Sequence, residues 1–160
     1  MVLWPAGLAL GLVWLVFRDP AFDYRVVVIG ALLPDLLDAP FGGARVFHTL
    51  LASVVVLTLV MLGTRGRRHL RRSLLALPIG MFAHLVADGM WARTDTFWWP
   101  FLGRRLSGPL PALDHGVAVL VLEELVGAVV VVWCWQRFRL GDRAVRDRFL
   151  RTGHLPRDLV

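Results

Sequence analysis

The sequence predicts an all-α integral membrane protein, a bundle of about five transmembrane helices. Hydrophobic residues make up 57% of the 160-residue chain, above the roughly 45–50% of a soluble domain. Apolar stretches of helix length alternate with short charged stretches. All 18 basic residues are arginine, and they cluster. One domain suits this length, with residues 1–136 forming the transmembrane part and residues 137–160 an arginine-rich cytoplasmic tail.

The first two apolar segments precede the "PDLLD" motif. Val2 to Phe17 is apolar and ends at "RDP", where charge and proline stop a helix. It lacks the basic start and the small-residue cleavage site of a signal peptide, which predicts a retained transmembrane helix. The second segment starts near Phe22 and runs through "YRVVVIGALLPDLLD". Its uncharged part is short, so it either spans with a polar outer end or enters the membrane as a re-entrant element.

Three further segments complete the predicted bundle. Segments three and four are Val46 to Leu62 and Ser73 to Trp91, separated by "GTRGRRHLRR". Segment five, His115 to Gln136, is the longest and contains the pair Glu123 and Glu124. The tail that follows is arginine-rich and partly amphipathic, which predicts a helix on the membrane surface and then a frayed end.

The arginine clusters predict the orientation of the bundle. Short cytoplasmic loops are enriched in basic residues, so the loop after segment three and the tail should both be cytoplasmic, with the N-terminus outside. Tryptophans mark membrane interfaces, and Trp14 is expected at the inner one with Trp133 and Trp135. Exclusive use of arginine, with abundant valine and alanine, is typical of a GC-rich bacterial or archaeal genome, which favours a prokaryotic plasma membrane.

In this topology, ionisable residues of four segments meet near the outer face. Two pairs, three and four residues apart, each project from one helical face. Such groups are costly in a membrane unless they are paired, hydrated or bound to a cation. Aspartates combined with histidines favour zinc, with manganese and iron as alternatives. The converging residues are Asp35, Asp38, His48, His84, Asp88, Asp114 and His115.

Three ordered motifs carry a resemblance to a known family. "GALLPDLLDAP", "ARVFHTLLAS" and "HLVADGMW" followed by "FWWPFLG" resemble the YdjM-type family of membrane-bound, metal-dependent hydrolases across residues 26–105. The family carries a Pro-Asp-x-x-Asp element, an arginine shortly before His-Ser or His-Thr, a His-x-x-x-Asp helix and a Trp-Pro segment. The resemblance implies a divalent metal held by a set of five residues, namely Asp35, Asp38, His48, His84 and Asp88.

The resemblance also implies that Arg45 anchors a phosphate or carboxylate. Many family members have a further histidine beside this arginine, where the present chain has Gly43 and Ala44. One ligand is therefore missing, or is supplied by Glu123, Glu124 or His115. Adjacent helical residues point about 100° apart, so only one of the two glutamates can face the site squarely. That one is a candidate ligand or proton acceptor.

The predicted function is hydrolysis of a phosphoester or lipid-borne substrate at the outer face, with membrane lipids as partners. Two alternatives stay open: an ion- or metal-coupled transporter, and a non-enzymatic scaffold with a structural metal. The polar pairs could also be a surface turn at "PDLLD" and a hydrogen-bonded helix contact in segment four. Long apolar runs argue against nucleic-acid binding, and a single cysteine excludes an intrachain disulfide and a multi-cysteine zinc site.

Overall fold

The computed structural model describes residues 1–103, 106, 108 and 116–159. Within these ranges every regular element is a helix, which confirms the all-α class. The main helices are α1 (Leu3–Phe17), α2 (Tyr24–Asp38), α3 (Leu50–Gly63), the consecutive pair α4 (Arg68–Leu74) and α5 (Ala76–Ala87), and α8 (Val117–Arg137). The remaining helices are η1 (Ala39–Phe41), η2 (Val46–His48), η3 (Met90–Ala92), α6 (Thr94–Phe97), α9 (Arg143–Thr152) and η4 (Arg157–Leu159).

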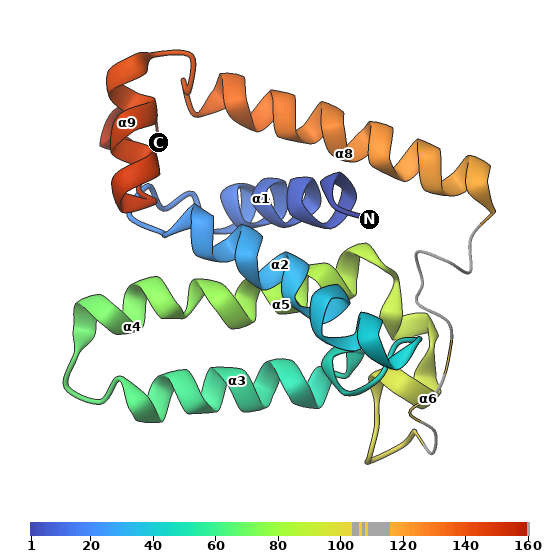
Figure 1. Ribbon diagram of the computed structural model, residues 1–160. Coiled ribbons are helices and arrows are strands. Elements are labelled where there is room, and N and C mark those ends of the chain that lie inside the picture. The colour runs from blue at the N-terminus through green and yellow to red at the C-terminus, as the bar shows by residue number, and fades with distance from the viewer. Residues whose placement is uncertain (104–105, 107, 109–115, 160) are drawn as a thin grey trace.

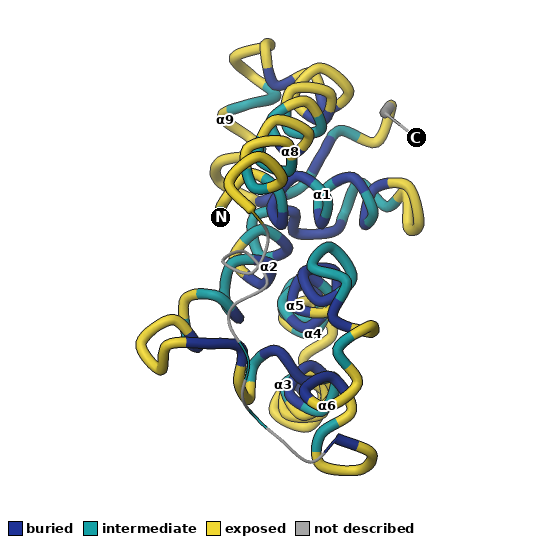
Figure 2. Tube along the Cα trace, turned by 90° about the vertical axis from the view of Figure 1, so that its right-hand side faces the viewer, coloured by how far each residue is buried: buried dark blue, intermediate teal, exposed yellow. Residues whose placement is uncertain are grey.

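The long helices form an up-and-down arrangement. Figure 1 shows α8, α1, the α4–α5 pair and α3 following one another across the molecule, with α2 crossing beside α5. Successive long elements run in opposite directions, and α9 lies across one end. The second view agrees, with α5 between α1 and α3 (Figure 2). The turn after α3 and helix α9 lie at one end of this array, and η1, η2 and α6 lie at the other.

Glycines permit close backbone approach at two helix crossings. A Cβ on Gly30 of α2 would overlap the backbone carbonyl of Leu77 in α5, and one on Gly80 of α5 would overlap the carbonyl of Val27. Likewise, a Cβ on Gly7 of α1 would overlap the carbonyl of Gly127 in α8, and one on Gly127 would overlap the carbonyl of Leu3 in α1. Small residues at such contacts are typical of helix packing in membranes. The α2–α5 crossing carries the candidate site, which lies about one turn beyond it on each helix.

Two stretches of the described chain have the length and composition of membrane-spanning helices. They are Arg68–Ala87, which joins α4 and α5, and Val117–Arg137, which is α8. Only 11% of the apolar window of α8 is buried, so most of its valines and leucines face outward, as expected for a helix in lipid. Helices α1 and α3 are apolar but shorter, with 15 and 14 residues, and the five-span bundle stays a prediction.

The arginine-rich tail packs against the helical body. Phe138, Leu140 and Leu155 are buried in the same hydrophobic cluster as Trp14 and Tyr24. The backbone N–H of Leu155 donates to the carbonyl of Pro20 at 2.7 Å. The expected frayed end is therefore wrong, because apolar side chains of the tail cover the turn between α1 and α2. Trp14, expected at the inner interface, is 4% exposed and packs edge-on against Phe138, so the tail covers its side chain.

Candidate metal centre

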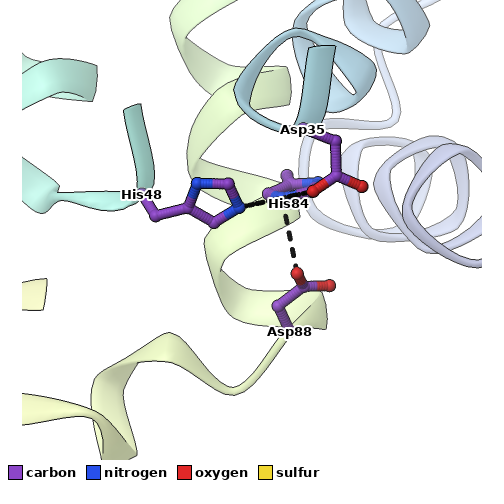
Figure 3. Close-up of side chains that lie close together, drawn as sticks. All are labelled: Asp35, His48, His84 and Asp88. Atoms are coloured by element: carbon purple, nitrogen blue, oxygen red, sulfur yellow. Dashed lines mark hydrogen bonds and ion pairs between the residues drawn. The ribbon is translucent and has the colours of Figure 1, made fainter. Parts of the chain in front are cut away.

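The candidate site lies where α2, η2 and α5 meet. Asp35 is on the last turn of α2, and His84 is on the last turn of α5. Asp88 follows as the residue that caps α5, and His48 ends η2. Figure 3 shows these four side chains pointing toward one another, Asp35 from α2, His48 from η2, and His84 and Asp88 from α5 and its C-cap. Both histidines are fully buried, while the side chain of Asp35 is 19% exposed and its Oδ1 is buried.

The four donor atoms lie close enough to share one ion. Nε2 of His48 lies 3.4 Å from Nε2 of His84 and 3.4 Å from Oδ1 of Asp35. Nε2 of His84 lies 3.4 Å from Oδ2 of Asp88 and 3.7 Å from Oδ1 of Asp35. All four atoms fall within 4.8 Å of one another. Ligand atoms bound about 2.0–2.1 Å from one tetrahedral zinc lie about 3.3–3.4 Å apart, so the geometry fits a divalent metal.

Asp38 orients His48 from behind. Its Oδ2 lies 2.7 Å from Nδ1 of His48 and accepts the backbone N–H groups of Arg45 at 2.8 Å and Phe47 at 3.2 Å. A neutral His48 that donates Nδ1–H to Asp38 keeps a lone pair on Nε2, and this atom faces the other donors. Carboxylate–histidine pairs of this kind orient metal ligands. The structure thus differs from the ligand set that the resemblance implies: Asp38 lies outside the four-donor group and positions one of its members.

The same hydrogen bonds explain why the chain folds back at this point. Asp38 is the last residue of α2, and η1 turns the chain immediately after it. Asp38 is 1% exposed, and its carboxylate accepts hydrogen bonds from the backbone N–H groups of Arg45 and Phe47, in the segment that ends at His48. Thr49 then caps α3, its hydroxyl accepting from the N–H of Ala52 at 3.1 Å. A carboxylate seven to ten residues before its partners carries no local sequence signal, so this role was missed.

Unsatisfied oxygens support the assignment of a cation site. Oδ1 of Asp35 and Oδ2 of Asp88 are buried and lack a hydrogen-bond partner within the described part of the chain. Buried carboxylate oxygens without a partner are costly. Both atoms face the Nε2 atoms at the centre of the cluster, which is where a cation would satisfy them. The residues present can therefore hold a metal ion, and the mixed imidazole and carboxylate donors fit zinc, manganese or iron.

The two adjacent glutamates of α8 have different surroundings. The carboxylate of Glu124 accepts the backbone N–H groups of Val2 at 2.8 Å and Leu3 at 3.1 Å. Glu124 therefore caps the start of α1. This structural role explains why a glutamate stands at this position, without any part in catalysis. Glu123 is within electrostatic range of Asp88, although it is not one of the four donors. Of the two, Glu123 is the one whose charge reaches the candidate centre.

Three further residues were predicted at or near the site: Arg45, Asp114 and His115. The guanidinium of Arg45 donates from Nε to the carbonyl of Phe41 at 3.1 Å, on an exposed surface beside the cluster. Its backbone N–H, bound to Asp38, has a clearer part in building the site. Asp114 and His115, which were expected to join the same constellation, lie outside the described residues.

Comparison of the chain with family models, with curated proteins and with solved structures finds no match. The resemblance to the YdjM-type hydrolases accordingly stays a prediction.

Proposed function

We propose that the protein is a membrane-embedded, metal-dependent hydrolase acting on a phosphoester of a lipid-borne substrate. The observation that carries the proposal is the buried group of two histidines and two aspartates at one end of an apolar helical array. The arginine-rich turn after α3 lies at the opposite end. By the positive-inside rule that end is cytoplasmic, which puts the metal centre toward the outer face of a prokaryotic plasma membrane.

The proposed chemistry divides between the metal and the chain. A divalent ion in this site would supply Lewis-acid activation of the attacking water and of the phosphoryl group. Asp35, His48, His84 and Asp88 would hold the ion, and Asp38 would keep His48 in its binding orientation. Glu123 is the proposed proton acceptor, because it is the glutamate of α8 whose charge acts on Asp88 and it is not one of the four donors. Arg45, on the exposed rim, is the proposed contact for the negative charge of the substrate.

Hydrolysis of a phosphoester joins a water oxygen to phosphorus and releases an alcohol. The water gives up a proton to Glu123. As the bond between phosphorus and the leaving oxygen breaks, protonated Glu123 or solvent water returns a proton to the alkoxide, which leaves as the alcohol. The site suits such a bond because it lies at the end of the apolar array, where a lipid phosphate meets the membrane surface. Asp35, the most exposed of the four donors in its side chain, marks the side from which the phosphate approaches.

A transporter is less well supported by the arrangement of charges. A carrier needs polar groups along the path of the ion. Beyond the cluster, α3 continues as "SVVVLTLVMLG" and α8 as "LVGAVVVVWCW", with no charged residue. A scaffold with a structural metal is the second alternative, and the number of donors favours it. Four protein donors would fill a tetrahedral coordination sphere, as in structural zinc sites, so hydrolysis would need a fifth coordination position or the release of one donor.

Elemental analysis of the detergent-purified protein tests the proposal directly. We expect stoichiometric zinc, manganese or iron in the wild type and none in an Asp35→Ala/His84→Ala double variant with matched folding. A phospholipid hydrolysis screen should then find activity that His84→Ala abolishes and Glu123→Gln slows without loss of metal. Glu124→Gln is the matched control, because it alters only the cap of α1 and should keep both metal and activity.

Two outcomes would count against this function. Full activity in His84→Ala would exclude the metal centre as the site of hydrolysis. Absence of metal from wild type and variants alike, even after reconstitution, would favour a polar network that holds the helices together. Flux of protons or metal in vesicles would then separate the carrier from the scaffold.

A further inference from the structure

Positive charge is concentrated at one end of the molecule. Residues 18–25, 65–72 and 137–158 together carry 14 of the 18 arginines and only five of the 12 acidic residues, which leaves an excess of nine positive charges. These stretches form the turn between α1 and α2, the turn after α3 with the start of α4, and the tail with α9. All three lie at the same end of the helical array (Figure 1). The folded chain therefore has one strongly basic end.

Few of these charges are neutralised within the chain. Among the described residues, Asp19, Asp23 and Asp158 each form an ion pair with one arginine. Asp142 caps α9, where it accepts from the N–H of Ala144 at 2.8 Å. Six exposed arginines in the turn after α3 and on α9 form no ion pair within the described chain, and we call them the arginine set: Arg65, Arg67, Arg68, Arg143, Arg148 and Arg151. Their counter-charges must come from outside the chain.

Helix α9 is held in a fixed position at this end. Nη1 of Arg25 donates to the carbonyl of Leu150 at 2.8 Å, and the N–H of Tyr24 donates to the carbonyl of Gly153 at 3.1 Å. Gly153 ends α9 with a φ of +73°, a conformation that favours glycine. Phe149 packs against the hydrophobic cluster of the helical body. The arginines of α9 are therefore presented at one level of the fold instead of on a free tail.

That level matches an expected membrane interface. Only 11% of the apolar window of α8 is buried, and the end of this helix carries Trp133 and Trp135, which are 40% and 46% exposed. Tryptophans concentrate where the hydrocarbon core of a bilayer meets the headgroups. Helix α8 ends at Arg137, and α9 begins at Arg143 and runs across the array rather than along it (Figure 1). In the proposed orientation α9 thus lies along the headgroup layer of the cytoplasmic leaflet.

An exposed leucine stands among the arginines of α9. Leu150 is 61% exposed, and it shares a helical face with Arg143, about two turns earlier. Arg146 and Arg151 flank this face. A leucine within a basic face is typical of helices in a membrane interface, where leucine meets acyl chains and the basic residues meet anionic headgroups. A nucleic acid would match the arginines alone, so a lipid surface fits this helix better.

We propose that the arginine set binds the phosphate groups of anionic phospholipids in the cytoplasmic leaflet. Guanidinium groups recognise phosphate oxygens through charge-assisted, often bidentate hydrogen bonds. Helix α9 and the turn after α3 supply contacts at two places of the same end (Figure 1), so the bound lipids fix the depth of the helices in the bilayer. The inference rests on the membrane embedding in the proposed function, and it is independent of the metal centre and of hydrolysis.

Lipid selectivity in reconstituted vesicles tests the proposal. The full chain is placed in phosphatidylcholine vesicles with a trace of phosphatidylglycerol or phosphatidylcholine, spin-labelled on an acyl chain. The immobilised fraction is read from the electron paramagnetic resonance spectrum. One basic residue near an anionic lipid changes the affinity by a factor of about five, so we expect the wild type to prefer phosphatidylglycerol by at least about fivefold. Equal immobilisation of the two lipids would overturn the proposal.

Paired variants show whether the arginine charges cause the preference. Arg65→Gln and Arg143→Gln should each lower the preference for phosphatidylglycerol by about two- to fivefold. Arg65→Lys and Arg143→Lys are the matched controls, because they keep the charge at the same positions, and they should retain most of the preference. Glutamine variants that equal the wild type, or lysine variants that lose as much as the glutamine variants, would overturn the electrostatic basis of binding.

Spin labels on α9 test its position in the interface. A label on Leu150→Cys should be more accessible to oxygen, which concentrates in the bilayer, than to a relaxation agent confined to water. A label on Thr152→Cys, on the opposite face of the helix, should show the reverse order. Cys134 is buried and should stay unlabelled. Equal accessibility at the two positions would overturn the interfacial placement of α9.

A competing partner and the proposed function are separated by further readouts. Single-stranded RNA that displaces phosphatidylglycerol from the wild type, and binds less to the same glutamine variants, would overturn the lipid assignment in favour of a nucleic acid. Bound metal without lipid preference overturns this inference and leaves the hydrolase standing. Lipid preference in a protein that holds no metal supports this inference and overturns the hydrolase. Extraction of the protein from vesicles by alkaline carbonate would overturn both, because both need a membrane-embedded chain.

Discussion

Replacing Asp38 tests whether this carboxylate supports metal binding by orienting His48, without itself binding the metal. Its Oδ2 accepts three hydrogen bonds, from Nδ1 of His48 at 2.7 Å and from the N–H groups of Arg45 and Phe47 at 2.8 and 3.2 Å. Losing the partner of a metal-bound histidine costs about 10–100-fold in metal affinity. Alanine also leaves the two N–H groups without their acceptor, at about 1–3 kcal/mol each if they stay buried.

Asparagine and alanine should therefore rank in order of effect. Asp38→Asn keeps one acceptor oxygen and should weaken metal binding by about tenfold. Asp38→Ala should approach a hundredfold loss and should lower the free energy of unfolding by about 2–6 kcal/mol. Competition with a metal chelator measures the affinity, and thermal or denaturant unfolding in detergent measures the stability.

A double-mutant cycle supplies the decisive comparison. If Asp38 acts by orienting His48, Asp38→Asn should have no further effect on affinity in a His48→Ala background. The His48→Ala variant alone gives the baseline for loss of a ligand. An equal loss from Asp38→Asn in both backgrounds would show that Asp38 binds the metal itself, and would refute the positioning role.

Two further predictions concern the helix packing and the arginine-rich end. Gly80→Ala should lower the free energy of unfolding by about 1–3 kcal/mol or more and weaken metal binding, because its Cβ meets the carbonyl of Val27. Gly63→Ala, with nothing within 4 Å of its Cβ, should match the wild type in the same thermal unfolding assay, and equal melting temperatures for both variants would contradict the packing argument. At the other end, burial tends to raise the pKa of Asp19, but hydrogen bonds from Arg72 and the N–H of Ala21 outweigh it and hold the pKa below its ordinary value of 3.8. The Asp19–Arg72 ion pair therefore stabilises the fold above pH 3.8, and this stabilisation is lost as the pH falls through the lowered pKa. Arg72→Ala should lower the free energy of unfolding by up to about 1 kcal/mol near neutral pH and should not change it in strong acid. A difference in the free energy of unfolding that does not depend on pH would exclude this ion pair as its cause.

Local patterns in the sequence determined the class of the protein and most of its candidate residues. Helix-length apolar runs predict helices whatever their neighbours, because backbone hydrogen bonds in a helix are satisfied within the segment. The i,i+4 spacing of His84 and Asp88 puts both on one face of a helix, and the structure brings their Nε2 and Oδ2 atoms to 3.4 Å. Asp35 and His48 join them as the ordered motifs predict.

The roles of the remaining polar residues were decided by the tertiary structure. Asp35 and Asp38 look equivalent in the sequence, yet only Asp35 faces the cluster. The chain turns back at the end of α2 and presents its N–H groups to Asp38. Glu123 and Glu124 also look equivalent in the sequence, yet the carboxylate of Glu124 is bound to backbone N–H groups at the start of α1. A hydrogen-bond partner is set by the direction in which two segments meet, and that direction is a property of the packed helices rather than of residue spacing along the chain.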